Sequence, residues 1–164
     1  MRYAQIRSCD IANGVGIRVS LYVQGCTRHC KGCFNPETWD FNGGKPWTEE
    51  VEKHFLKLLG KPQIVGCTIL GGEPLEPQTR EALLELLYKI REKYPTKTIW
   101  IYSSYVYEEL VASCPEILGL IDVLVDGMFI EAKKDIKLRF RGSSNQRVIR
   151  VKESLESGEV IVMS

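Results

Sequence analysis

The chain has 164 residues, of which 44% are hydrophobic and 26% are charged, and its 22 Lys and Arg nearly balance its 21 Asp and Glu. This composition is typical of one folded domain, and the length falls short of the roughly 250 residues of a complete eight-stranded α/β barrel. A net charge of +1 disfavours nucleic acid as the main ligand, and the lack of a signal peptide or a long apolar run predicts a cytoplasmic protein that uses no membrane.

Strands and helices are predicted to alternate along the chain. The strands are short runs rich in β-branched and aromatic residues, and the helices have apolar residues at helical spacing. Thr48 is a possible helix cap, and Gly60, Pro95 and Pro115 each end a helix. The predicted order is strand 17–24, helix 48–59, strand 65–70, helix 79–94, strand 98–102, helix 105–114 and strand 121–125, with weaker strands at 137–141 and 148–151.

This order predicts an α/β fold with a mostly parallel sheet, right-handed crossovers and helices on its outer face. We expect a single domain over residues 1–152 and a possible C-terminal tail over 153–164. Ligands of parallel sheets bind at the carboxyl ends of the strands, where the conspicuous motifs of this sequence also lie. One site at that edge is therefore expected to collect them.

Three of the six cysteines, Cys26, Cys30 and Cys33, form a C-x3-C-x2-C cluster. A [4Fe–4S] cluster normally takes four thiolates, so three ligands would leave one iron open for chemistry. Structural zinc is the main alternative, but it needs further ligands such as Cys67 or His29. Disulfides are a second alternative, and the spacing typical of bacterial ferredoxins is absent.

The cluster Cys26–Cys33 resembles the motif of the radical S-adenosylmethionine (SAM) enzymes. Within that superfamily, the chain is similar from about residue 3 to residue 150 to the activating proteins of anaerobic (class III) ribonucleotide reductases. The segments that carry this resemblance are 13–18, 32–35 with Thr38 and Trp39, 70–75, 125–127 and 141–146.

The resemblance implies a partial, incomplete TIM-like β/α barrel of the radical SAM type. It implies one [4Fe–4S] cluster held by Cys26, Cys30 and Cys33, with SAM bound to the remaining iron. One electron from the cluster would cleave SAM to a 5′-deoxyadenosyl radical, which takes a hydrogen atom from a glycine of the partner reductase. The electron donor would be a flavodoxin or a ferredoxin, and no catalytic residue is expected beyond the cluster ligands.

The family motifs also imply where SAM binds. Gly71 and Gly72 would let the backbone approach the methionine group, and the Glu73 carboxylate would accept a hydrogen bond from its ammonium. An aromatic face at Phe34 would stack on adenine, and Asp126 would lie close to SAM. The full expected set is Gly32, Cys33, Phe34, Gly71, Gly72, Glu73, Ser103 and Asp126.

Simpler interpretations remain beside these. Gly71-Gly72 and Asp126-Gly127 also suit ordinary turns, and Phe34 also suits a core position. The loop 141–147 suits ligand binding, partner binding or a solvated turn equally well. Cys9, Cys67 and Cys114 are expected to be small buried residues without a chemical role.

Other functions are also compatible with these motifs. The nearest alternative is an activase of another glycyl radical enzyme, such as the one that cleaves pyruvate, or a radical enzyme with a small-molecule substrate. A non-catalytic iron–sulfur or zinc module is a different class. The short chain leaves little structure to enclose a small substrate, which favours a protein partner that completes the site.

Overall fold

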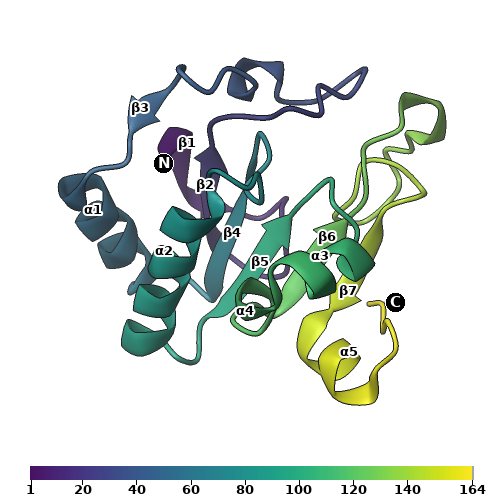
Figure 1. The fold of residues 1–164 in the computed structure, drawn as a ribbon. Coiled ribbons are helices and arrows are strands. Elements are labelled where there is room, and N and C mark those ends of the chain that lie inside the picture. Colours follow the sequence, from purple (N-terminus) through teal and green to yellow (C-terminus); the bar gives the residue numbers. More distant parts are fainter. Residues whose placement is uncertain (164) are drawn as a thin grey trace.

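A seven-stranded sheet lies at the centre of the structure, a computed structural model that describes residues 1–163 (Figure 1). Its order is β3-β1-β2-β4-β5-β6-β7, and the inner strands β2, β4, β5 and β6 are parallel. The pairs β3–β1, β1–β2 and β6–β7 are antiparallel. The strands are β1 (Arg2–Asp10), β2 (Arg18–Val23), β3 (Lys45–Pro46), β4 (Gly66–Gly71), β5 (Thr98–Tyr102), β6 (Val123–Asp126) and β7 (Arg147–Arg150).

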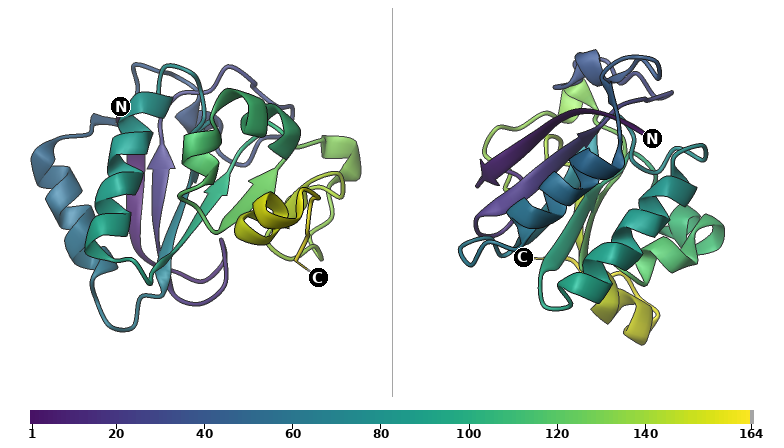
Figure 2. Two further views of the ribbon diagram at one scale, coloured as in Figure 1. Left: turned by 60° about the horizontal axis from the view of Figure 1, so that its bottom comes forward. Right: turned by 90° about the vertical axis from the view of Figure 1, so that its left-hand side faces the viewer.

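The helices cover one face of this sheet (Figure 2). They bury its alternate apolar residues, such as Leu21, Ile69 and Ile101, which lie beside one another across three parallel strands. The opposite face carries a smaller apolar cluster around Trp100 and Val125. The helices are α1 (Glu49–Leu59), α2 (Arg80–Lys93), α3 (Tyr107–Ser113), α4 (Pro115–Leu118) and α5 (Val151–Ser157), with 3-10 turns η1 (Pro36–Thr38) and η2 (Glu131–Lys133).

The predicted mixed α/β fold with a parallel centre is confirmed, and so are the strands at 17–24, 65–70, 98–102, 121–125 and 148–151 and the three helices. The strand predicted at 137–141 is wrong, because that segment turns: Leu138 N–H donates to Asp135, and Phe140 has a positive φ of 65°. Strands β1 and β3 were not predicted from the sequence. Both lie at an edge of the sheet, where polar residues are tolerated and the apolar pattern is weak.

The C-terminal residues pack back onto the sheet. Helix α5 runs across residue 152 and ends at Gly158, which has a left-handed φ of 75°. Val162 then pairs with Ile149 of β7 in an antiparallel bridge, and the Met163 N–H donates to Val148 at 2.7 Å. No helix among residues 1–163 is long and apolar enough to cross a membrane.

Cys67 and Cys114 are buried as predicted, but the prediction that Cys9 is buried is wrong. Cys9 lies on β1, an edge strand with an exposed side, so its side chain meets solvent.

A buried arginine lies at the amino-terminal ends of the parallel strands, on the sheet face opposite the helices. Arg18 is 1% exposed and donates five hydrogen bonds, all to hydroxyl or carbonyl oxygens of the loop before β2 and of strands β4 and β5. Its guanidinium lies 5.5 Å from the ring of Trp100. Burial lowers the pKa of Arg18, but five acceptors hold the cation in place.

Candidate active site

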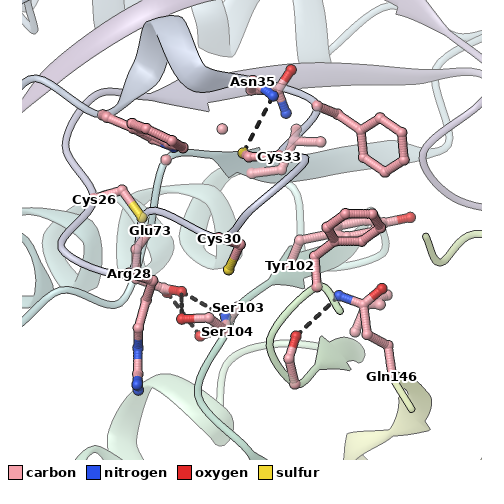
Figure 3. Close-up of a pocket in the computed structure, with 18 residues that line it drawn as sticks. Cys26, Arg28, Cys30, Cys33, Asn35, Glu73, Tyr102, Ser103, Ser104 and Gln146 are labelled. Atoms are coloured by element: carbon pink, nitrogen blue, oxygen red, sulfur yellow. Dashed lines mark hydrogen bonds between the residues drawn. The ribbon is translucent and has the colours of Figure 1, made fainter. Parts of the chain in front are cut away.

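One pocket lies at the carboxyl ends of the parallel strands, where the sequence motifs were expected to meet (Figure 3). The loop after β2 supplies the three clustered cysteines, and the ends of β4, β5 and β6 supply the other walls. Eight predicted site residues line it: Cys26, Cys30, Cys33, Phe34, Gly71, Gly72, Glu73 and Ser103. Gly32 and Asp126 lie outside this lining.

Positive φ angles shape the cysteine loop. Gly25, with φ of 111°, lies two residues after the end of β2, and Gly32, with φ of 77°, turns the chain before Cys33. His29 adopts a φ of 47°, which is unusual for a residue with a side chain. Its ring stacks on Trp39, with centroids 4.4 Å apart and planes 13° apart, and this contact holds the loop between Cys26 and Cys30 in its turned form.

The thiols are partly withdrawn from solvent. Burial raises the pKa of Cys26 and of Cys30. Backbone N–H groups oppose this shift, those of Arg28 and His29 at Cys26 and that of Phe129 at Cys30. The Asn35 N–H also donates to the Cys33 sulfur at 3.4 Å. Amide donors around a sulfur stabilise a metal-bound thiolate and tune its metal.

The donor set fits an iron–sulfur cluster. Three soft thiols face one pocket, and thiolates are the ligands that iron–sulfur clusters prefer. Within residues 1–163, no three His, Cys, Asp or Glu side chains are grouped as ligands of a single metal ion. A cuboidal cluster needs no such grouping, because each thiolate binds a different iron.

Gly71 and Gly72 are glycines because the end of β4 touches the neighbouring backbone. A Cβ on Gly71, whose φ is 115°, would lie 2.6 Å from the Val23 carbonyl oxygen. A Cβ on Gly72 would lie 2.5 Å from the carbonyl oxygen of Gly25. The Glu73 N–H donates to the same Gly25 oxygen at 2.8 Å. The glycine pair therefore clamps the cysteine loop to the sheet.

The Glu73 carboxylate is buried and joins two strand ends. One oxygen accepts from the Ser104 N–H and hydroxyl, both at 2.6 Å, and the other accepts from the Leu75 N–H at 3.0 Å and the Ser103 hydroxyl at 2.8 Å. Burial raises the pKa of Glu73, whereas these four hydrogen bonds lower it. All four lone-pair sites of the carboxylate thus have protein donors.

The Asp126 carboxylate is buried behind the pocket wall. Arg147 donates to both of its oxygens, at 3.0 and 2.6 Å, and the Tyr107 N–H donates at 2.8 Å. Arg147 also reaches Glu108 at 2.9 Å, and its hydrogen bond with Asp126 raises the pKa of Arg147. These contacts fasten the start of α3 to β6 and β7.

Sequence reasoning missed several residues of the pocket. Arg28 lies 4.3 Å from the ring of Tyr105 and lines the wall between two cysteines. The Tyr102 hydroxyl is buried and has no partner among the described residues, and its burial raises the pKa of Tyr102. Gln146 donates to the Gly127 carbonyl at 3.0 Å. The position of Tyr102 at the last residue of a parallel strand was the available signal.

A second cavity, of about 460 Å³, continues from this pocket over the sheet face opposite the helices. The two share Phe34, Asn35, Leu70, Tyr102, Phe129 and Gln146. The cysteine site therefore opens into a larger space lined by aromatic and basic residues.

Comparison with known proteins identifies the family of the chain. Residues 12–149 match a family model described as a 4Fe-4S single cluster domain. A relative from Salmonella typhi, named anaerobic ribonucleoside-triphosphate reductase-activating protein, is 43% identical over 150 residues, which cover 90% of this chain and 97% of the relative.

Relatives with the same name come from other sources. The one from Escherichia coli K12 is 42% identical, with 90% of this chain and 97% of the relative covered. The one from Enterobacteria phage T4 is 38% identical over 148 residues, which cover 90% of this chain and 93% of the relative. With this 4Fe-4S domain match and these relatives, the chain belongs to the family of anaerobic ribonucleoside-triphosphate reductase-activating proteins.

Proposed function

We propose that the protein activates an anaerobic ribonucleoside-triphosphate reductase by generating a glycyl radical on it, as a radical SAM enzyme. One observation carries this proposal. The three clustered cysteines of a chain that matches a 4Fe-4S domain line the same pocket as Gly71, Gly72 and the end of β5. A metal centre and a space for its co-substrate therefore meet at the carboxyl ends of the parallel strands.

In this proposal Cys26, Cys30 and Cys33 hold three irons of one [4Fe–4S] cluster, and the fourth iron binds SAM. The bound cluster and SAM would supply one electron and the 5′-deoxyadenosyl radical that takes a hydrogen atom from a glycine of the reductase. The sheet of four parallel strands with helices outside would be part of an incomplete TIM-like barrel of the radical SAM type.

The residues of the chain would bind and orient SAM and exclude water. Gly71 and Gly72 would keep the wall flat beside the methionine group, and Phe34, with Gly32 and Cys33, would lie toward the adenine. Because Glu73 already has four donors, we propose that it positions Ser103 and Ser104. The Ser104 hydroxyl oxygen keeps a free lone pair for the SAM ammonium. Asp126 would support the pocket wall from behind, because it holds the start of α3 against β6 and β7 through Tyr107 and Arg147.

The remaining partners follow from the chemistry. The reaction consumes one electron per SAM, so the protein needs a low-potential one-electron donor, and we propose a flavodoxin or a ferredoxin in the cytoplasm. The pocket continues into the larger cavity beside the 128–146 loop, and we propose that a segment of the reductase enters there.

The test uses anaerobically reconstituted protein with dithionite and SAM. We expect 5′-deoxyadenosine, and a glycyl radical doublet in electron paramagnetic resonance when the anaerobic reductase is added. A protein with an intact cluster that forms no 5′-deoxyadenosine would contradict the proposal. A doublet on a pyruvate-cleaving glycyl radical enzyme, with none on the ribonucleotide reductase, would assign the other target.

Two cysteine variants test the ligand assignment. Cys30→Ala removes a thiol of the pocket, so we expect loss of iron, of the cluster absorbance and of 5′-deoxyadenosine formation. Cys9→Ala is the matched control, because Cys9 is exposed on β1 and lies outside the pocket. Equal iron content in the two variants would show that Cys30 is not a ligand.

A further inference from the structure

The 128–146 loop, which connects β6 to β7, forms one wall of both cavities. Phe129 and Gln146 line both, and Lys134, Ile136 and Arg141 line the larger one. Figure 1 shows this loop in yellow-green beyond the carboxyl ends of the parallel strands. On the opposite wall, Phe34 from the cysteine loop packs against Phe129, with ring centroids 5.0 Å apart.

The exposed surface of this loop is both basic and apolar. Residues 128–146 contain five Lys or Arg and two Asp or Glu, a net charge of +3, whereas the whole chain carries +1. Lys133 and Lys137 have no carboxylate within 4.0 Å among the described residues. Ile136, near the middle of the loop sequence, is 91% exposed, and Phe34 of the neighbouring cysteine loop is 58% exposed.

The proposed reaction requires a protein to cover this loop. A hydrogen atom passes from a glycine to the radical only when the two carbons are in contact, so a segment of the reductase must enter the pocket. The 128–146 loop forms a wall of that pocket, and a chain that enters must pack against it. Lysines that lose water in the complex need carboxylate partners, because an unpaired buried charge is costly.

We propose that the 128–146 loop is the docking surface for the reductase, and that the reductase meets it with Asp and Glu side chains around an apolar contact for Ile136. This proposal rests on the proposed function. The electron donor is not the expected occupant, because it needs only to approach the outer side of the cysteine loop, where Thr27, His29 and Lys31 are exposed.

The test compares two charge reversals. The first pair, Lys133→Glu with Lys137→Glu, changes the docking surface. The second pair, Lys53→Glu with Lys57→Glu, changes two exposed lysines of α1, which lies at the opposite side of the molecule from the loop (Figure 1). We expect the first pair to weaken binding of the reductase roughly tenfold or more at low salt, and less at high salt. The second pair should bind like wild type. Dithionite serves as reductant in this comparison, so no donor protein is involved.

Formation of 5′-deoxyadenosine without reductase separates this proposal from the proposed function. It should stay at the wild-type rate in the Lys133/Lys137 variant while the glycyl radical yield falls. A wild-type protein that forms no 5′-deoxyadenosine would instead disprove the proposed function itself.

Ile136→Ser provides an uncharged second test, with an expected loss of reductase binding and unchanged iron content. Wild-type reductase affinity in both the charge variant and the serine variant would overturn the docking proposal. So would a defect that occurs only when a flavodoxin replaces dithionite, because it would assign the loop to the electron donor.

Discussion

At the scale of single residues, the site depends on polar contacts that join distant parts of the chain. Glu73 receives donors from residues 30 positions away, and Asp126 is held by Arg147, which lies 21 positions away. The sequence identified both carboxylates, because each follows a buried strand, but it predicted ligand contacts for them. Their protein partners were not predictable, since pairing between distant residues follows from the assembled sheet and not from local pattern.

Glu73→Gln tests the positioning role. The amide keeps the shape of the side chain but turns an NH2 group toward two protein donors, so we expect the free energy of unfolding to fall by about 1–3 kcal/mol and SAM to bind more weakly. Urea denaturation and SAM titration measure these two effects. Glu76→Gln is the control, because Thr27 uses only one oxygen of Glu76, and the amide oxygen can take its place. Equal losses in both variants would contradict the role of Glu73.

At the scale of elements, a single carboxylate fastens helices to the amino-terminal end of the sheet. Asp122 accepts from Arg91 of α2 at 2.5 Å, from the Ile99 N–H of β5 at 2.8 Å and from Lys152 of α5 at 3.1 Å. Burial opposes ionisation, but the hydrogen bonds from Arg91 and Ile99 lower the pKa of Asp122 below its ordinary value of 3.8. This end lies away from the pocket, so its role is structural.

Asp122→Asn should lower the free energy of unfolding at pH 7 by about 1–3 kcal/mol, because Arg91 loses its half-buried charged partner. Since the folded pKa lies below the unfolded one, this contribution is complete above the unfolded value and is lost as the pH falls through the folded value. The difference between wild type and variant should therefore shrink in acid, as measured by denaturation at several pH values. A stability difference that stays constant with pH would contradict the lowered pKa of Asp122. Glu116→Gln, at an exposed carboxylate of α4, is the control.

Local pattern predicted the central elements well, for reasons visible in their composition. Strand β4 is buried over most of its length and reads as an apolar run, and α1 shows helical spacing with a Thr48 cap that accepts from Val51. The 137–141 segment alternates like a strand but turns. Phe140 packs on the sheet face opposite the helices, and Leu138 lines the larger cavity. Strand β1 was not predicted because its own residues show no clear apolar alternation. Its pairing with the buried strand β2 makes it a strand.

At the scale of the whole molecule, Arg18 joins three strands from inside the protein. Arg18→Lys keeps the charge but offers three donors where five hydrogen bonds exist, so some acceptors on β4 and β5 would lose their partners. We expect a loss of about 1–3 kcal/mol in the free energy of unfolding, measured by the denaturation midpoint. The exposed Arg150→Lys should change it little, and a similar loss there would contradict this explanation.

The two edges of the sheet differ in how much unpaired backbone they present. Residues 161–163 cover β7, whereas β3 pairs with β1 only at Arg2 and Tyr3, which leaves the outer edge of β1 without a strand partner further along in the described residues. Unpaired edges are where sheets of different molecules join and grow into fibrils. The edge that residues 161–163 present is only three residues long, whereas β1 has nine residues, so we expect strand addition between two copies to occur at β1.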